Sequence, residues 1–191
     1  MKLILIGAGG HARNVIEMLS PAGHELIGYV DPNPCAWIDR PHWKYESDTG
    51  SIPLDVGVVL GIGGVTPDQL KRRMEILRRY REDGRAAPCI VHPQAIVSKT
   101  AALGDGAQIM AGSMLQANCT IGHGAIVNTG AIVEHDAQIE EGVHVAPGAI
   151  VLGAVSVGAY AMVGAGSIVL QGASVPAATL VKAGSRFPQS A

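Results

Sequence analysis

An aliphatic residue recurs at every sixth position through the second half of the chain. The series runs without a gap over sixteen positions: Val91, Val97, Leu103, Ile109, Leu115, Ile121, Val127, Val133, Ile139, Val145, Val151, Val157, Val163, Val169, Val175 and Val181. A helix spaces its apolar residues about 3.6 apart and a half-buried strand about 2 apart, so a spacing of six fits neither. A hexapeptide period is typical of a parallel β-helix. The sequence therefore predicts stacked coils over most of residues 91–181.

Small residues occupy the position four residues after most of these aliphatic side chains. Examples are Ala107, Ser113, Cys119, Ala125, Ala131, Ala137 and Ala161. In a hexapeptide coil the sixth residue points inward and the small residue lets the chain turn a corner. Each coil of such a solenoid rests mainly on its two neighbours. We therefore expect Cys119 to be an inward-facing core residue.

A glycine loop joins the first predicted strand to the first predicted helix. The apolar run Lys2–Ile6 leads into Gly7–Ala12, which matches the pattern G-x-G-x-x-A ahead of a helical apolar pattern. Such glycines let the backbone approach a diphosphate at a helix N-terminus. A tight turn without a ligand remains an alternative. We do not expect NAD, because this unit is too small for both halves of a dinucleotide fold.

Two further strands and a second helix complete a small parallel α/β unit. The strand over 25–30 ends at Asp31, where an acidic side chain can accept hydrogen bonds from a ribose or base. The strand over 56–60 ends in the glycine turn Gly61–Gly64. Thr66–Gln69 is a capping box with proline at the first helical position, and it predicts a helix to about residue 83. Residues 32–53 read as irregular.

The two halves together resemble a known family. A head containing Gly9, Gly10 and His11 precedes Ile-Val-His-Pro-Gln-Ala and then the hexapeptides. This combination resembles the bacterial sugar acetyltransferases with hexapeptide repeats, which include UDP-4-amino-sugar N-acetyltransferases, perosamine N-acetyltransferases and sialic acid O-acetyltransferases. The resemblance implies a small Rossmann-like α/β domain over 1–86 and a left-handed parallel β-helix over 87–191. It also implies a homotrimer with active sites between subunits.

The resemblance also implies the substrates and the residues that meet them. The head is expected to bind a nucleotide sugar through Gly9, Gly10, His11, Asp31, Gly61 and Gly63. Val133–Asp136 matches the catalytic segment, with His135 as general base and Asp136 stabilising its imidazolium. Acetyl-CoA is the implied co-substrate, and no metal is expected. The implied acetyl-CoA contacts are His144, Gly153, Ala165 and Ala183.

The last residue of each hexapeptide should point out of the coils, because it lies between two inward ones. One outer column is apolar and comprises Ile96, Met114, Ile132, Ile150 and Ile168. A second is mostly apolar and comprises Gln108, Ile126, His144, Met162 and Leu180. The third is polar and comprises Ala102, Thr120, Gln138, Ser156 and Ser174. Two apolar outer faces predict two partner interfaces, as in a closed ring of three.

His144 interrupts its apolar column, which costs desolvation free energy unless the imidazole is paired or used. His135 is expected at a corner between Ala117 and Gly153 of the adjacent coils, where small neighbours leave room for a ligand. A backbone N–H near Gly153 is a candidate oxyanion donor. His92 and His123 read as plain turn or surface residues.

Composition narrows the class of protein. The net charge of −2 gives no electrostatic footprint for nucleic acid. No apolar run approaches the roughly 20 residues of a membrane span, and no signal peptide is evident, which predicts a cytoplasmic protein. The three cysteines are scattered without metal-ligand spacing.

Three alternatives remain open at this stage. The first is O-acetylation of sialic acid, because sequence alone does not separate amine from hydroxyl acceptors. The second is a carbonic-anhydrase-like zinc site, which the wide spacing of His92, His123, His135 and His144 disfavours. The third is a non-catalytic trimeric scaffold.

Overall fold

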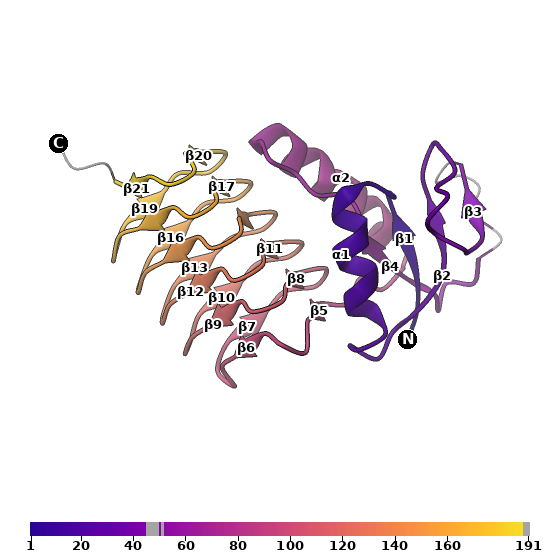
Figure 1. Cartoon of the computed structure of the whole chain (residues 1–191), viewed down its shortest axis with the longest axis horizontal. Helices are drawn as coiled ribbons and strands as arrows, with labels where there is room; N and C mark the ends of the chain where they lie inside the picture. Colours follow the sequence, from indigo (N-terminus) through magenta and orange to yellow (C-terminus); the bar gives the residue numbers. More distant parts are fainter. Residues whose placement is uncertain (45–49, 51, 189–191) are drawn as a thin grey trace.

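The head is a four-stranded parallel sheet flanked by two helices. The computed structural model describes residues 1–44, 50 and 52–188, and part of the irregular segment 32–53 therefore lies outside the described residues. The sheet order is β3-β2-β1-β4 (Figure 1). The elements are β1 (Lys2–Ile6), α1 (Gly10–Leu19), β2 (Glu25–Val30), β3 (His42–Trp43), β4 (Gly57–Leu60) and α2 (Pro67–Glu82). The predicted strands and the α2 boundaries are confirmed.

The capping box at α2 forms with one difference. Thr66 accepts a hydrogen bond from the Gln69 amide at 3.4 Å, as the sequence predicts. The Gln69 side chain reaches back to the amide of Val65 at 2.9 Å, one residue before the cap. Together they satisfy two amides at the start of the helix.

Among the described residues of the head, the edge strand β3 is an element that the sequence did not indicate. It pairs in parallel with β2, with Tyr29 opposite His42 and Val30 opposite Trp43. A Cβ on Gly28 would lie 2.1 Å from the Trp43 ring, so only glycine allows the indole to lie across β2. Two residues are too few to give a readable alternation, which explains why the pattern was missed.

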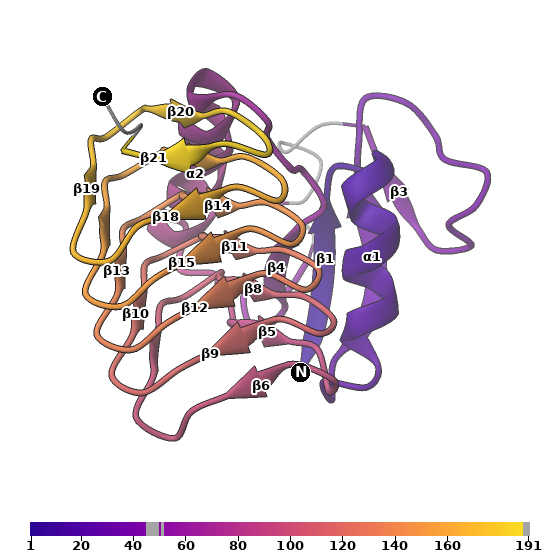
Figure 2. The same cartoon turned by 60° about the vertical axis from the view of Figure 1, so that its left-hand side comes forward.

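Residues 90–187 form a parallel β-helix whose short strands stack into three sheets (Figure 2). The head-facing sheet contains β5 (Ile90–Val91), β8 (Gln108–Ile109), β11 (Ile126–Val127), β14 (His144–Val145), β17 (Met162–Val163) and β20 (Leu180–Val181). The apolar sheet contains β6 (Ile96–Val97), β9 (Met114–Leu115), β12 (Ile132–Val133), β15 (Ile150–Val151), β18 (Ile168–Val169) and β21 (Arg186–Phe187). The polar sheet contains β7 (Ala102–Leu103), β10 (Thr120–Ile121), β13 (Gln138–Ile139), β16 (Ser156–Val157) and β19 (Ser174–Val175).

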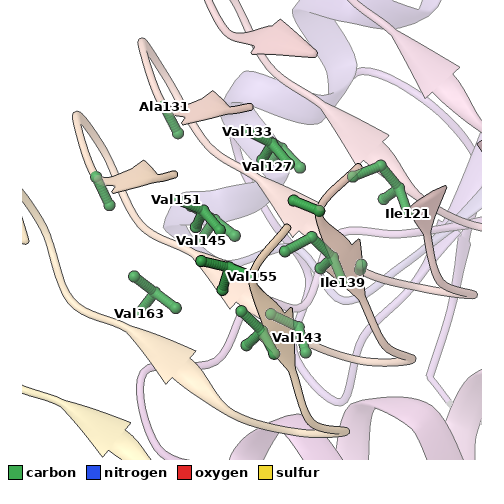
Figure 3. Close-up of a cluster of buried hydrophobic side chains, with 14 of the residues drawn as sticks. Ile121, Val127, Ala131, Val133, Ile139, Val143, Val145, Val151, Val155 and Val163 are labelled. Atoms are coloured by element: carbon green, nitrogen blue, oxygen red, sulfur yellow. The ribbon is translucent and has the colours of Figure 1, made fainter. Parts of the chain in front are cut away.

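Each strand pairs with the strand one coil away, in a register of 18 residues. Val127, for example, lies opposite Val145, and Val133 lies opposite Val151. The aliphatic sixth residues fill the interior together with the small residues (Figure 3). Val133, Val145 and Cys119 are all 0% exposed, which confirms the predicted inward positions.

Helix α2 runs along the corner between the polar and head-facing sheets. The corner residues Gly106, Gly124 and Gly142 have φ values of 68°, 60° and 64°. A Cβ on Gly124 would lie 2.4 Å from Met74 Sδ, and one on Gly142 would lie 2.6 Å from Met74 Cγ. Glycine is therefore favoured by the left-handed backbone and required by the helix that packs over it.

The head covers the outer column of the head-facing sheet, which corrects one expectation. Ile126 is 0% exposed, and it packs in one cluster with Met18 of α1. Met162 is 7% exposed, and only Leu180 at the far end is open, at 52%. The prediction that this column meets another subunit was wrong, because the chain's own head occupies it. The column on the apolar sheet is uncovered, and its Ile96 is 63% exposed.

Candidate active site

His135 and Asp136 form a hydrogen-bonded pair at the corner that joins β12 to β13. His135 Nδ1 lies 2.8 Å from Asp136 Oδ2, and each side chain is 55% exposed. Asp136 has a φ of 60°, and its other oxygen accepts from Asn118 Nδ2 at 3.3 Å. The hydrogen bonds from His135 and then from Asn118 lower the pKa of Asp136. The carboxylate is therefore ionised at neutral pH and fixes the proton of His135 on Nδ1.

Gly153 makes room for the imidazole from the adjacent coil. A Cβ on Gly153 would lie 2.7 Å from His135 Nε2, so the absence of a side chain lets the ring lie across this position. Within the described part of the chain, Nε2 has no hydrogen-bond partner, and the Gly153 amide donates to no backbone carbonyl. The corner thus presents a free lone pair beside a free N–H donor.

His144 lies elsewhere, where the head meets the coils. It is 5% exposed, and its Nδ1 donates to the Gly64 carbonyl at 2.7 Å. Its Nε2 accepts from Asn128 Nδ2 at 3.0 Å, so both ring nitrogens are engaged. Burial lowers the pKa of His144. The imidazole is therefore neutral, and the desolvation expected at this position is offset by pairing within the chain.

The other predicted acetyl-CoA contacts do not meet within one chain. Ala165 and Ala183 are exposed, one coil apart, at the corner that follows β17 and β20. Gly153 is buried at the corner that follows β15. These two corners border opposite edges of the apolar sheet. The acetyl-CoA role of these residues and of His144 stays a prediction.

The glycine turn after β4 borders a 590 Å³ cavity in the head. Gly7, Asp31, Gly63 and Gly64 line it, at the carboxyl ends of three parallel strands. Ligands bind at this edge in open α/β sheets. The cavity therefore brings together part of the predicted sugar-nucleotide site, namely Asp31, Gly63 and the turn.

Asp31 is engaged with the backbone of its own unit. Its Oδ2 accepts from the Ala8 amide at 2.9 Å, and its Oδ1 accepts from the Asn33 amide at 2.9 Å. It therefore orders the glycine loop as well as lining the cavity. The sequence predicted that Asp31 binds the sugar nucleotide, but it did not predict these hydrogen bonds to the backbone.

The predicted substrate-binding glycines differ in why they are glycine. A Cβ on Gly61 would lie 2.1 Å from the Gly7 carbonyl oxygen, so packing alone demands glycine there. Gly9 and Gly10 are exposed, and a Cβ on either would meet nothing within 4 Å. The protein's own packing does not require glycine at these two positions, which leaves close approach of a ligand at the start of α1 as a reason.

Two buried polar residues near the cavity were missed by sequence reasoning. Arg73 of α2 is 0% exposed and Gln108 of β8 is 1% exposed. His11 donates to Gln108 Oε1, with a separation of 2.8 Å. A signal for Gln108 was present, because it interrupts the same apolar column as His144. Arg73 lies three residues after Leu70 and four before Leu77, so helical spacing placed it on the buried face of α2, but its charge gave no reason to expect burial there.

The remaining histidines of the coils are turn residues, as predicted. His92 Nδ1 accepts from the Gln94 amide, and His123 Nδ1 accepts from the Asp105 amide, both at 3.0 Å. Among the described residues, no three His, Cys, Asp or Glu side chains lie together as a metal site would require. Within the same residues, no helix has both the length and the apolar character needed to cross a membrane.

Two protein-family models match the chain. The PglD N-terminal domain matches residues 2–76, and the bacterial transferase hexapeptide model of six repeats matches residues 100–135. A sequence comparison with curated proteins gives no significant match.

Solved structures cover the chain from end to end. PerB from Caulobacter crescentus, in complex with CoA and GDP-perosamine, is 32% identical with a TM-score of 0.87, covering 100% of this chain and 90% of that one. This chain belongs to the hexapeptide-repeat sugar acetyltransferases. The acetyltransferase domain of PglB from Neisseria gonorrhoeae, in complex with acetyl coenzyme A, is 29% identical with a TM-score of 0.86, covering 96% of this chain and 88% of that one.

A more distant likeness shows the fold alone. WeeI from Acinetobacter baumannii is 18% identical with a TM-score of 0.64, covering 95% of this chain and 96% of that one. The family confirms the predicted architecture of this acetyltransferase, a small α/β head followed by a left-handed parallel β-helix.

Proposed function

We propose that this acetyltransferase moves an acetyl group from acetyl-CoA to an amino group of a nucleotide-linked sugar, with His135 as general base. The observation that carries the proposal is the 2.8 Å contact between His135 Nδ1 and Asp136 Oδ2, which leaves Nε2 free above Gly153. PerB, the relative that covers the whole chain, is solved with CoA and GDP-perosamine, and the PglB domain with acetyl coenzyme A.

The chemistry follows from the free lone pair on Nε2. His135 takes a proton from the sugar amine as the nitrogen attacks the thioester carbonyl, and Asp136 stabilises the imidazolium that forms. The Gly153 N–H is the candidate donor to the oxyanion of the tetrahedral intermediate. The carbon–sulfur bond then breaks, and the imidazolium returns its proton to the departing CoA thiolate. No acyl-enzyme is required, and Cys119 is sealed in the core at 0% exposure.

Under this proposal, the site that binds the sugar nucleotide and the base that acts on it belong to different subunits. The head packs on the head-facing sheet, whereas the His135 corner joins the apolar sheet to the polar sheet. The uncovered apolar column supplies a surface on which another copy can pack. We therefore propose a homotrimer in which the head of one subunit faces the His135 corner of the next.

Replacing Ile150 with Glu tests the assembly. This side chain is half-buried on the apolar sheet, and a carboxylate there would be desolvated in a subunit contact. We expect the variant to be a folded monomer by light scattering and circular dichroism, where the wild type is a trimer. Glu in place of the exposed Leu170 is the matched control. A monomeric wild type would contradict the proposed shared site.

The acceptor is tested by a thiol-release assay. Purified protein and acetyl-CoA are incubated with UDP- and GDP-linked amino sugars in one arm, and with CMP-sialate and free sialate in the other. We expect thiol release with an amino sugar and an N-acetyl product by mass spectrometry. Release only with a sialate would instead establish the O-acetyltransferase alternative. No release with any acceptor, together with no binding of acetyl-CoA, would favour the scaffold.

A further inference from the structure

A fully buried arginine lies between the head and the coils without a carboxylate partner. Arg73 is 0% exposed, and among the described residues no acidic side chain forms a salt bridge with it. Its guanidinium donates to the Ile62 carbonyl from Nε at 2.8 Å, and to the Gly124 carbonyl from Nη1. Burial lowers its pKa to about 9. Burial of a charge without a carboxylate partner costs free energy, which points to a role for Arg73 beyond filling space.

Gln108 connects this arginine to the glycine loop of the head. Its Oε1 accepts from Arg73 Nη2 at 3.1 Å, and its Nε2 donates to the Leu60 carbonyl at 2.7 Å. These two partners fix which end of the amide is oxygen, because the guanidinium can only donate and the carbonyl can only accept. The third contact, to His11 Nε2 at 2.8 Å, must therefore be a hydrogen bond that His11 donates.

The tautomer of His11 follows from this arrangement. Burial lowers its pKa to about 4, so the ring is neutral at pH 7 and carries one N–H. With that proton on Nε2, Nδ1 keeps its lone pair. A Cβ built on Gly63 would lie 3.7 Å from this Nδ1, which places the nitrogen beside the turn that borders the cavity. His11 is thus held as a hydrogen-bond acceptor at this place.

The glycine turn is held from the same side. Arg73 binds the Ile62 carbonyl, and His144 binds the Gly64 carbonyl at 2.7 Å. These two carbonyls are therefore tied to α2 and to the coils, while Gly63 and Gly64 line the cavity. One connected set of hydrogen bonds fixes both predicted sugar-nucleotide elements, His11 and the turn, against the β-helix.

We propose that Arg73 and Gln108 are positioning residues for the sugar nucleotide, which act by holding His11 as an Nε2–H tautomer and the Gly61–Gly64 turn in its binding conformation. Arg73 borders the cavity from within the packed contact but is itself 0% exposed, so it acts through these partners. The proposal rests on the proposed function only in assigning His11 and the turn to the sugar nucleotide. The tautomer and its cause are independent of that assignment.

The tautomer is tested directly by NMR. Long-range ¹H–¹⁵N spectra of the histidine side chains, with His11 assigned from a His11→Gln variant, should show a protonated Nε2 at pH 7. Gln108→Glu keeps the size of the side chain but turns the donor toward Leu60 into an acceptor and adds a negative charge. We expect this variant to show His11 protonated on both nitrogens at pH 7. An Nδ1–H ring in the wild type, or an unchanged ring in Gln108→Glu, would overturn the proposal.

Affinity is tested with UDP and GDP as probes by calorimetry. Arg73→Lys keeps the charge but loses the forked geometry that reaches three acceptors. We expect it to weaken nucleotide binding about tenfold, on the scale of one lost hydrogen bond, and to leave acetyl-CoA affinity within about twofold. Gln108→Glu should weaken nucleotide binding likewise, and it serves if Arg73→Lys does not fold.

A matched control comes from the same helix. Arg78 also ties α2 to the coils, through Glu141 Oε1 at 2.6 Å and the Tyr160 hydroxyl at 2.7 Å, but it is exposed and away from the turn. Arg78→Lys should leave nucleotide affinity unchanged. Equal losses in Arg73→Lys and Arg78→Lys, or none in folded Arg73→Lys and Gln108→Glu, would reduce Arg73 to a structural role. If the wild type binds neither UDP nor GDP, the nucleotide assignment fails and the positioning proposal fails with it, while the NMR result still reports the tautomer.

Discussion

The head–coil contact and the His135 corner are both polar, yet they are built in opposite ways. At the contact, Arg73, Gln108 and His144 are buried, and their hydrogen bonds are made within the chain. At the corner, the side chains of His135 and Asp136 are each 55% exposed, and Nε2 of His135 has no hydrogen-bond partner among the described residues. A closed network fixes a shape, whereas an open pair is left ready for substrate. Under the proposed function, stability and chemistry are therefore separated in this molecule.

The largest expected effect is on the rate of catalysis at the His135 corner. His135→Ala should lower kcat by roughly 10²–10⁴, the usual contribution of a positioned general base. The unfolding midpoint should stay within a degree or two of wild type, on the order expected for an exposed substitution, because the ring packs against little. Steady-state kinetics at saturating acceptor and thermal unfolding measure both. Activity within about threefold of wild type would remove His135 from the mechanism.

At the contact between the head and the coils, substitution should lower stability strongly. Ile126→Ala removes a side chain that is 0% exposed between head and coils, and it should lower the free energy of unfolding by about 2–5 kcal/mol. Ile150→Ala is the matched control, because Ile150 holds the same hexapeptide position on the uncovered apolar sheet. Urea unfolding at low protein concentration compares the two. Equal losses would show that the apolar sheet is covered as fully as the head-facing one.

Acid should weaken the contact between the head and the coils before it affects the coils themselves. The pKa of folded His11 is about 4, against about 6.5 for an unperturbed histidine. The unfolded chain therefore takes up this proton first, so the contribution to stability is complete above about pH 6.5 and is lost as pH falls toward 4. At pH 5 the loss is about 2 kcal/mol, and the lowered pKa of His144 acts in the same direction.

Urea unfolding of wild type and His11→Gln at pH 7 and pH 5 measures this loss. The substitution removes the titrating ring, so the variant should lose less free energy of unfolding between the two pH values. Identical pH dependence in both proteins would show that His11 does not carry the effect.

The smallest expected effect is the loss of kcat on replacing Asp136, the hydrogen-bond partner of His135. Asp136→Asn keeps the left-handed corner, because asparagine is among the few residues that accept a φ near 60°. It removes the charge that stabilises the imidazolium, and kcat should fall about tenfold at pH 7. The double variant with His135→Ala should be no slower than His135→Ala alone. Additive losses would mean that Asp136 acts on the substrate by another route.

Local signals predicted most of the fold. The period of six placed the inward residues of the coils, and capping chemistry placed the start of α2 at Pro67. The roles of His135 and Asp136 were predicted from the resemblance to the family, and the contact between their side chains is local because the two residues are adjacent in sequence. Contacts between segments that are distant in the sequence could not be predicted from it. The covering of Ile126 by α1 and the hydrogen bonds of Arg73 depend on how two units pack, and no single-segment pattern records that.

The strand pairing sets a rule for how this chain can change in length. Neighbouring coils match residue by residue at an offset of 18, as for Ile126 and His144. An insertion within the strands that is not a multiple of six would move core residues to the surface, and one of six or twelve would shift every later strand to another sheet. Helix α2 occupies the glycine corners at Gly106, Gly124 and Gly142, and the next corner residue is Tyr160. Arg78 of α2 also binds the Tyr160 hydroxyl, and Leu70 packs with Met162. A coil added or removed beyond Met162 would therefore leave these contacts of α2 in place, so growth of the solenoid in that direction does not disturb how the head is held.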